Sequence, residues 1–463
     1  MKITFLGATR TVTGSRHLIE ANGSKVLLDC GLYQGRRSVA REVNREVACF
    51  PGNLDAVVLG HAHIDHSGNL PTLAGCGWEG PIHATSATAD LCASMLMDSA
   101  YLQERDVEFV NKRLRRQGKP LVEPLHTKRD AARAISMFVG HDYHEPFEVA
   151  DGVTVTYHDA GHILGAALTQ VDVRENGRTT RIGYIVDLGR KKLPILRDPE
   201  SVGDLDVLIM ESTYGNRYHG GMESAAGKLA DVVNRTAGRG GKVIIPAFAM
   251  ERTQEMLYLL HELWRDGRIP ELPIYVDSPL AINLTEVFDK HLDLVDADMQ
   301  KRLRAGEDPF EFGRLQYTRT KRESMELNSL RMPAIIISAS GMCEGGRILH
   351  HLRNNIENHR NTIMIVGFMA EHTLGRRIVD RKPVVRIFGD EFRLKADVAV
   401  MNVFSAHADR DGLVDYAKSA GRPKVAFLVH GEESQAQVLA DVLRDEVGMS
   451  DVRIPSQADV FET

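Results

Sequence analysis

The segment 61–66 places four metal-binding side chains within six consecutive residues. It reads His-Ala-His-Ile-Asp-His and follows the apolar run 56–59, which is typical of a buried strand. The alternation of ligand and apolar residues after such a strand aims several side chains at one point. Neutral imidazole and carboxylate are ligands that zinc takes at catalytic sites. A single histidine here would be explained as a partner of the backbone, but the cluster predicts a zinc site.

Seven apolar runs along the chain end directly in an ionisable residue. Ligands of open α/β sheets gather at the carboxyl ends of strands. A single aspartate at a strand end is usually a turn or cap residue, but the recurrence favours one shared site. The residues concerned are Asp29, His61, His158 with His162 just beyond it, Asp187, Glu211, His407 and His430.

The elements expected to position these residues fall into two patterns. The first third alternates short apolar runs with amphipathic segments, which indicates a mixed α/β domain; strands are expected at 3–6, 17–19, 26–28, 56–59, 153–157 and 168–173, and helices at 87–116 and 127–139. From residue 206, regular alternation of strand and helix predicts a parallel sheet; strands are expected at 207–210, 243–245, 274–276, 334–337 and 363–366, and helices at 224–235, 253–265, 281–295 and 347–358.

The last part of the chain, from residue 386, is too short to bury a core of its own. Its expected strands, at 385–388, 398–404 and 425–429, and its expected helix at 435–447 therefore complete the first domain. This predicts that 1–208 and 386–463 form one domain, and that 209–385 form a second domain inserted into it.

Composition narrows the class of protein. The chain has 463 residues and a formal net charge of −6, which argues against a general basic coat for nucleic acid but not against a local basic groove. The sequence has no apolar run of the length that a membrane helix needs and no apolar N-terminal signal segment. Five scattered cysteines without a C-x-x-C pair are typical of a reducing compartment. We therefore expect a cytoplasmic protein without a membrane partner.

The motifs resemble those of a known family. His61-x-His63-x-Asp65-His66, Gly161-His162, Asp187-Leu188-Gly189 and Leu28-Asp29-Cys30-Gly31 are similar to the metallo-β-lactamase superfamily. Glu211-Ser212-Thr213-Tyr214-Gly215, Ser405-Ala406-His407-Ala408-Asp409 and Leu428-Val429-His430-Gly431-Glu432 resemble motifs A, B and C of its β-CASP nucleases, which include ribonuclease J and the pre-mRNA 3′-end processing endonuclease. The resemblance implies an α/β fold, namely an αββα sandwich with an inserted parallel-sheet β-CASP domain.

The resemblance also implies a role for each motif residue. One Zn²⁺ would bind His61, His63 and His162, a second Zn²⁺ would bind Asp65, His66 and His430, and Asp187 would bridge the two. Two such metals activate a shared water and neutralise charge on a phosphorane. The resemblance also places Asp65 and Asp29 among the catalytic residues. Asp29 would orient a ligand histidine.

His407 would act away from the metals as the general acid for the leaving ribose oxygen. Glu211 would hold its tautomer and raise its basicity, and histidine suits this task because its pKa lies near neutrality. The alternative explanation of His407 is the start of a helix, because Ser405 and Asp409 are plausible caps. The two roles are compatible.

Small and basic residues in the second domain would contact substrate phosphates. The resemblance covers Ser338-Ala339-Ser340-Gly341-Met342, Gly345-Gly346-Arg347 and Thr373-Leu374-Gly375-Arg376, where backbone amides and arginines can bind anions. Glycines after strands are usually only turns, and surface arginines are usually only solvated. The substrate-binding residues expected on this basis are Ser338, Ser340, Gly341, Arg347 and Arg376.

The chain departs from the family pattern at two places. Ile185-Val186 precede Asp187 where Ser-Gly is frequent, and Met369-Ala370-Glu371-His372 replaces a segment in which Gln and Gly are common. Neither change alters an expected metal ligand. The second change concerns the placement of the substrate and not metal binding.

The leading interpretation is a zinc-dependent ribonuclease that cuts single-stranded RNA as an endonuclease, a 5′ exonuclease or both. A DNA-directed relative is one alternative, but such proteins commonly have Val where this chain has His430. A small-molecule metallo-hydrolase would not require motifs A, B and C. An inactive scaffold of an RNA-processing complex usually lacks ligands, and none is missing here. A homodimer is compatible with the sequence.

Overall fold

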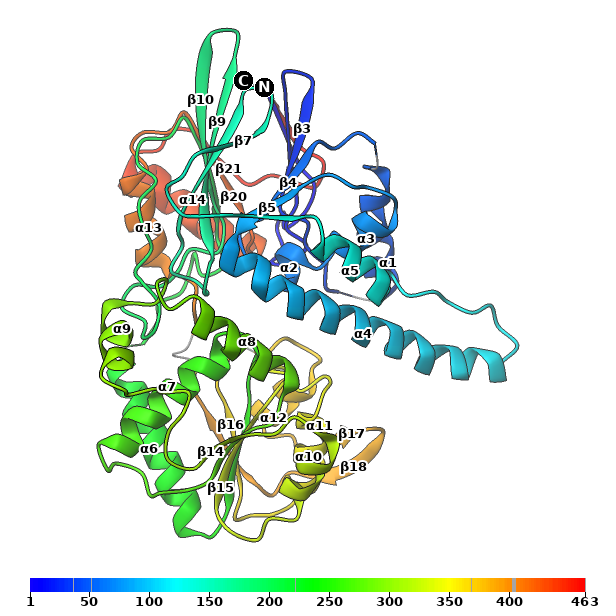
Figure 1. Ribbon diagram of the computed structural model, residues 1–463, viewed down its shortest axis with the longest axis vertical. Helices are drawn as coiled ribbons and strands as arrows, with labels where there is room; N and C mark the ends of the chain where they lie inside the picture. The colour runs from blue at the N-terminus through cyan, green and yellow to red at the C-terminus, as the bar shows by residue number, and fades with distance from the viewer. Residues whose placement is uncertain (36, 51, 221, 368, 402–404, 463) are drawn as a thin grey trace. The chain divides into compact units, whose positions relative to one another are not determined.

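The computed structural model describes residues 1–35, 37–50, 52–220, 222–367, 369–401 and 405–462, and these form two compact units (Figure 1). Unit 1 comprises Met1–Lys192, Arg197–Tyr218 and Ala406–Thr463, and unit 2 comprises Leu193–Leu196 and His219–Ser405. Unit 2 thus lies within the sequence of unit 1, and its C-terminal limit falls later than the expected boundary at 385/386. None of the helices in the described ranges has both the length and the apolar character that crossing a bilayer requires.

Unit 1 contains two seven-stranded sheets. In spatial order the first consists of β22 (Val460–Glu462), β1 (Lys2–Phe5), β2 (His17–Ala21), β3 (Ser24–Leu28), β4 (Ala56–Val58), β5 (Ile82–Thr85) and β6 (Phe138–His141). The second consists of β21 (Val452–Arg453), β20 (Val425–Val429), β11 (Val207–Glu211), β10 (Arg178–Ile185), β9 (Ala167–Glu175), β8 (Val153–Asp159) and β7 (Phe147–Ala150).

The two sheets of unit 1 pack face to face around one core. Residues of both sheets are fully buried in the same cluster, and the rings of Phe5 and Phe427 lie 4.7 Å apart. Along β8 the pattern of buried and half-buried residues alternates strictly, so Val153, Val155 and Tyr157 point into this core. Burying one such side chain contributes about 1.5–3 kcal/mol. The core therefore fixes how the edges of the two sheets lie against each other.

Helices cover the outer faces of these sheets. The helix α4 contacts β5 and β6, whereas α14 contacts β20, which completes the αββα arrangement (Figure 1). The helices of unit 1 are α1 (Arg37–Arg45), α2 (Ile64–Ser67), α3 (Leu70–Gly75), α4 (Ser86–Arg116), α5 (Lys128–Ile135), α13 (Arg410–Ser419) and α14 (Glu433–Val442), with the short turns η1 (Glu46–Cys49) and η2 (Leu443–Val447).

Parallel pairing brings the carboxyl ends of several strands together. In the first sheet Leu28 of β3 pairs with Val58 of β4, and both strands end there. In the second sheet β10, β11 and β20 are parallel neighbours, and Glu211 pairs with Val429 at their ends. The residues that follow these strands must therefore emerge at neighbouring points.

Unit 2 is built on a parallel six-stranded sheet in the order β14 (Leu315–Tyr317), β13 (Ile274–Val276), β15 (Ala334–Ser338), β12 (Lys242–Pro246), β16 (Thr362–Ile365) and β19 (Asp397–Val400). A hairpin of β17 (Val384–Ile387) and β18 (Asp390–Arg393) accompanies it. Its helices are α6 (Met222–Gly238), α7 (Arg252–Arg265), α8 (Pro279–Lys290), α9 (Ala297–Arg304), α10 (Lys321–Asn328), α11 (Ile348–Asn355) and α12 (Leu374–Val379). The predicted fold class is confirmed.

Several expected elements differ from the observed ones. The helix expected at 127–139 ends at Ile135, and Phe138–His141 forms β6 beside β5, because Phe and Val suit a strand better than a helix end. The strands at 385–388 and 398–404 are expected in the first domain, but they are β17, which pairs with β18, and β19, which pairs with β16, and both lie in unit 2. Residues 402–404 of the second expected strand lie outside the described residues.

Candidate metal centre and acid–base pair

Two candidate metal ligands of unit 1, and the carboxylate that supports a third, are presented by sharp turns after strands. Asp29 follows β3, Asp187 follows β10 and His430 follows β20, and their φ angles are +58°, +60° and +46°. Such left-handed conformations are strained for residues other than glycine and tend to cluster at functional sites. Each turn directs its side chain out of the sheet edge toward the same place.

Four side-chain atoms form a first compact group. His63 Nδ1 lies 3.1 Å from His61 Nε2 and 3.2 Å from His162 Nε2. Asp187 Oδ2 lies 3.2 Å from both His61 Nε2 and His162 Nε2, and 3.9 Å from His63 Nδ1. The four residues that the sequence assigned to one metal thus converge on one point.

The spacing of these atoms fits a tetrahedral metal better than a hydrogen-bond network. Zinc with nitrogen and oxygen ligands at about 2.0–2.1 Å requires ligand atoms roughly 3.3 Å apart, close to most of the observed distances. Three imidazole nitrogens facing one another cannot all be satisfied by hydrogen bonds, since a neutral imidazole carries a single proton. The donor set therefore fits a metal cation.

A second group lies on the other side of the Asp187 carboxylate. His66 Nε2 and His430 Nε2 are 3.1 Å apart, and His430 Nε2 is 3.5 Å from Asp65 Oδ2. Asp187 Oδ1, which is buried and accepts no hydrogen bond within the described residues, lies 3.4 Å from His66 Nε2 and 3.4 Å from His430 Nδ1. Asp187 thus offers one oxygen to each group.

Asp29 supports the second group from behind. Its Oδ2 lies 2.6 Å from His66 Nδ1 and accepts a 2.6 Å bond from the Tyr184 hydroxyl, which in turn lies 2.7 Å from Ser15 Oγ. Its Oδ1 accepts a bond from the backbone of Gly60. By accepting a hydrogen bond from Nδ1–H of His66, Asp29 favours the tautomer whose unprotonated Nε2 faces the candidate metal position, as carboxylate–histidine–zinc arrangements require.

Protonation states within the first group also suit metal binding. Burial lowers the pKa of His61 and of His162 to about 3, so both imidazoles are neutral. Burial raises the pKa of Asp187, but the surrounding histidines outweigh burial and hold that pKa well below its usual range. Neutral imidazole and ionised carboxylate are the forms that ligate metals.

His407 and Glu211 form a separate pair beside Asp187. His407 Nδ1 lies 3.0 Å from Glu211 Oε2, and Glu211 is fully buried. Glu211 Oε1 also accepts a 2.5 Å bond from the backbone of Leu188, the residue after Asp187. Burial lowers the pKa of His407, but Glu211 and Asp187 outweigh it and raise that pKa to about 10. A cation bound at Asp187 would offset part of this effect.

The backbone around His407 is held by neighbouring segments. Gly189 and His407 form an antiparallel bridge, and the amide of Ala408 donates to the carbonyl of Leu188 at 2.7 Å. Asp409 caps α13 by accepting from the amide of Gly412, which confirms the helix start expected just after His407. Acid–base and helix-start roles are thus structurally compatible.

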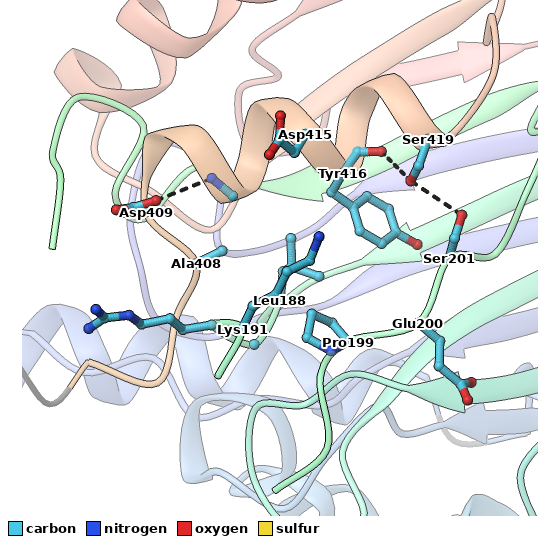
Figure 2. Close-up of a pocket in the computed structure, with 13 residues that line it drawn as sticks. Leu188, Lys191, Pro199, Glu200, Ser201, Ala408, Asp409, Asp415, Tyr416 and Ser419 are labelled. Carbon is cyan, nitrogen blue, oxygen red and sulfur yellow. Dashed lines mark hydrogen bonds between the residues drawn. The ribbon is translucent and has the colours of Figure 1, made fainter. Parts of the chain in front are cut away.

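A cavity of 340 Å³ lies next to this bridge (Figure 2). Backbone of the segments that follow Asp187 and His407 lines it, and α13 contributes Tyr416 and Ser419. Ser419 accepts a 3.2 Å hydrogen bond from Ser201, so the cavity wall ties α13 to the segment 199–201. None of the candidate metal ligands lines this cavity.

The expected substrate-binding residues all lie in unit 2 and have varied surroundings. Ser338 is buried and donates to the carbonyl of Asp277, whereas Ser340 Oγ accepts from the amide of Glu344. A Cβ atom at Gly341 would lie 2.8 Å from the ring of Phe248.

The two arginines among them are both paired. Arg347 donates to Asp277 Oδ1 at 2.7 Å and to the carbonyls of Thr318 and Arg319. Arg376 pairs with Asp380 at 3.0 Å. Arg347 is therefore held in place by unit 2 itself.

Sequence reasoning missed several supporting groups and added one that lies apart. Tyr184 and Ser15 support Asp29, and Thr213 Oγ1 donates to the carbonyl of His430. Thr213 stands inside motif A, which could have indicated it, whereas nothing in the sequence singles out Ser15. His158, expected at the shared site, lies within β8 and faces Glu200 and His144 instead.

Comparisons with known families agree with this geometry. Residues 12–166 match the model of the metallo-beta-lactamase superfamily, and 253–378 match that of the Beta-Casp domain. Residues 391–455 match the model described as Zn-dependent metallo-hydrolase RNA specificity domain. The three matches follow one another along the chain in the order of the predicted motifs.

Similar proteins extend the match to nearly the whole chain. Ribonuclease TTHA0252 of Thermus thermophilus is 36% identical over 446 residues, which cover 96% of each chain. Transcription termination factor FttA of Pyrococcus abyssi is 31% identical, over 100% of this chain and 71% of that protein. A crystal structure of an Enterococcus faecalis V583 protein shares the fold, with a TM-score of 0.55, 12% identity and 99% of each chain covered. The chain belongs to the β-CASP family of metal-dependent hydrolases within the metallo-β-lactamase superfamily.

Proposed function

We propose that this protein is a ribonuclease that hydrolyses RNA phosphodiester bonds with two zinc ions. The observation that carries the proposal is the arrangement of Asp187 between two groups of imidazoles, with the His407–Glu211 pair beside it. A binuclear centre next to an acid–base pair suits phosphodiester hydrolysis. The ribonuclease from Thermus thermophilus, similar over 96% of both chains, supports RNA as the substrate.

The chain's ligand set divides into two halves. His61, His63 and His162 would hold one zinc ion; Asp65, His66 and His430 would hold the other, with one oxygen of Asp187 for each. Two zinc ions in these positions would supply a water activated at neutral pH and offset negative charge on the scissile phosphate. Asp29 keeps His66 in the tautomer that exposes Nε2.

His407 would supply the proton that the leaving ribose oxygen needs. Its Nδ1 is committed to Glu211, so the transferable proton is the one on Nε2. Glu211 stabilises the protonated form, and its second contact with the amide of Leu188 keeps the carboxylate from rotating away.

We expect the unit 2 residues Ser338, Ser340, Gly341, Arg347 and Arg376 to take part in RNA binding. Cytoplasmic location also stays a prediction.

The test combines metal analysis with cleavage of defined RNA. Purified protein loaded with zinc and then dialysed should contain two metals per chain and should cut labelled single-stranded RNA. Matched DNA and lactone substrates test the alternative hydrolases. Fewer than two metals together with no RNA cleavage would contradict the proposal.

A second experiment, which compares RNAs with different ends, determines the mode of cleavage. RNAs with a 5′-monophosphate or a 5′-hydroxyl and a circular RNA of the same sequence present the same bonds with different ends. Cleavage of the circle requires endonuclease activity, whereas dependence on the 5′ group indicates attack from that end. Equal cleavage of all three RNAs indicates an endonuclease, whereas cleavage of the circle together with faster cleavage of the 5′-monophosphate RNA indicates both modes.

A further inference from the structure

The second half of α4 is an exposed helical arm of unit 1. The helix has 31 residues, which corresponds to about 46 Å, and its buried residues all lie in the half that ends at Ala100. In Figure 1 the C-terminal part of α4 extends past α5 and α3. The exposed face of this half gains little from packing on its own unit, so its surface chemistry calls for an explanation.

One face of this arm combines apolar and basic side chains. Residues 102, 109 and 116 lie two turns apart along one line of the helix, and 105, 112 and 113 flank that line. We call these six residues the α4 stripe: Leu102, Arg105, Phe109, Lys112, Arg113 and Arg116. Phe109 is 74% exposed, the largest fraction among the exposed large hydrophobic residues of the described chain, and Leu102 is 52% exposed.

The cations of the stripe are mostly uncompensated. Arg105 pairs with Glu108 at 2.9 Å. Within the part of the chain that the structure describes, Lys112, Arg113 and Arg116 form no ion pair. Surface cations usually have solvent as their only partner, but here three of them follow an exposed aromatic ring within the next two turns of the helix. An exposed aromatic ring among free cations is the surface that single-stranded nucleic acids use for stacking and for phosphate contacts.

We propose that the α4 stripe binds single-stranded RNA outside the catalytic centre, with a base stacked on Phe109 and phosphates on Lys112, Arg113 and Arg116. This inference rests on the proposed ribonuclease function. Charge complementarity selects this occupant over a second copy of the chain. A symmetric contact between two stripes would bring three uncompensated cations against three others, whereas an RNA strand supplies one phosphate per nucleotide.

The other end of α4 is attached to the loop that carries a candidate metal ligand. The hydroxyls of Thr85 and Thr88 donate to the carbonyl of Gly165 at 2.6 and 2.8 Å, and Gly165 lies three residues after His162. From Thr85 to Phe109 the helix rises about 36 Å. At roughly 3.4 Å per nucleotide, a stacked RNA strand needs about eleven nucleotides to reach from this loop to the stripe.

The inference therefore predicts a dependence on RNA length. Cleavage of an RNA of about 30 nucleotides and of one of about 6 nucleotides is compared for the full-length, zinc-loaded wild type and two variants. Phe109→Ala should raise KM for the long RNA at least about fivefold. The triple variant Lys112→Gln, Arg113→Gln and Arg116→Gln should depend less on salt. The slope of log KM for the long RNA against log salt concentration should fall by about 2. Neither variant should change kcat, nor KM for the short RNA.

The matched control removes exposed cations from another surface of unit 1. Arg174→Gln with Arg178→Gln, on the β9–β10 hairpin, should leave KM for both RNAs unchanged. If the wild type cuts both RNAs and the stripe variants keep the wild-type KM for the long one, the inference is wrong and the ribonuclease function stands. If the wild type cuts neither RNA, the ribonuclease function itself is refuted.

Two further measurements separate other occupants. If the stripe variants lose binding to phosphatidylserine vesicles while KM for the long RNA is unchanged, the surface serves a membrane and the inference is overturned. If they only lower the oligomeric state in sedimentation, the stripe is a self-contact and the inference is also overturned. Circular dichroism of each variant checks that α4 remains folded.

Discussion

Two buried aspartates at the carboxyl ends of parallel strands, Asp187 of unit 1 and Asp277 of unit 2, have opposite surroundings. The oxygens of Asp187 face four imidazole nitrogens at 3.2–3.4 Å. Those of Asp277 accept from Arg347 and Thr318 at 2.7 and 2.5 Å, and lie 2.6 Å from both Ser324 Oγ and His351 Nε2.

The two aspartates are both buried and differ in the groups that face their carboxylate oxygens. Every contact of Asp277 has hydrogen-bond length, so its network is complete and needs no further partner. The contacts of Asp187 have the length of edges in a metal coordination shell, and its Oδ1 is unsatisfied within the described residues. Contact length and donor count therefore distinguish a ligand carboxylate from a structural one at equivalent places in a parallel sheet.

The strongest test of this comparison is Asp187→Ala. Because one carboxylate serves both groups of imidazoles, the variant should bind neither zinc ion stably, and RNA cleavage should fall to background. Metal content by mass spectrometry and cleavage of labelled RNA measure the two effects. Two retained metals would mean that Asp187 does not bridge.

His407→Ala should separate acid–base chemistry from metal binding. We expect kcat to fall by about 10²–10⁴-fold, the usual contribution of a positioned general acid, while both metals remain bound. Single-turnover cleavage and metal analysis of the same preparation provide the measurement. Loss of a metal ion in this variant would reassign His407 to the ligand set.

Asp277→Asn should affect stability instead of chemistry. Removing one charge from a buried, hydrogen-bonded pair destabilises by about 3 kcal/mol, so urea unfolding should show a less stable unit 2 with an unchanged metal content. Glu286→Gln removes an exposed carboxylate that pairs with Arg319 and serves as the control, with little change expected. If Asp277→Asn loses metal, Asp277 is not a purely structural carboxylate, and the distinction from Asp187 is wrong.

The same variant gives a pH dependence with a definite sign. Burial raises the pKa of Asp277, but its hydrogen bonds with His351, Ser324, Thr318 and Arg347 outweigh burial and lower that pKa to about 2. A carboxylate with a depressed pKa stabilises the folded state above its unfolded value and loses this contribution as pH falls toward the folded value. The stability difference between wild type and variant should therefore be full above about pH 4 and should shrink toward pH 2 in acid-unfolding experiments.

The smallest expected effect is that of Asp29→Asn. Outer carboxylates that orient a ligand histidine typically contribute 10–100-fold to metal affinity, so the second zinc should bind more weakly while the first is retained. Competition with a chelator of known affinity measures this. Equal loss of both metals would show that Asp29 supports the fold of the whole site instead.

The sequence predicted the cluster 61–66 and the strand-end residues because ligands at short spacing and strand ends are local signals. The same local pattern also fits Asp277, which follows Ile274–Val276, yet that residue is structural. Its partners stand 41 to 74 positions away, so only the folded chain brings them together. Arg347, expected to contact phosphate, meets Asp277 for the same reason.

The α/β class was predictable because strand–helix alternation is carried by apolar periodicity, whereas the αββα sandwich was implied by the resemblance of the motifs. The helix end near Ile135 and the strand β6 after it were not predictable, since pairing with β5 decides the conformation of Phe138–His141. The tail after residue 384 divides between the units because β19 pairs with β16, which no sequence pattern specifies.

The positive φ angles of Asp29, Asp187 and His430 have a consequence for how the protein tolerates change. Glycine at any of these positions would relieve backbone strain of about 1–3 kcal/mol while deleting a functional side chain. Selection for thermostability alone would therefore favour an inert, glycine-bearing sandwich. Retention of the three strained residues is a trade-off in which activity is kept at the expense of conformational stability.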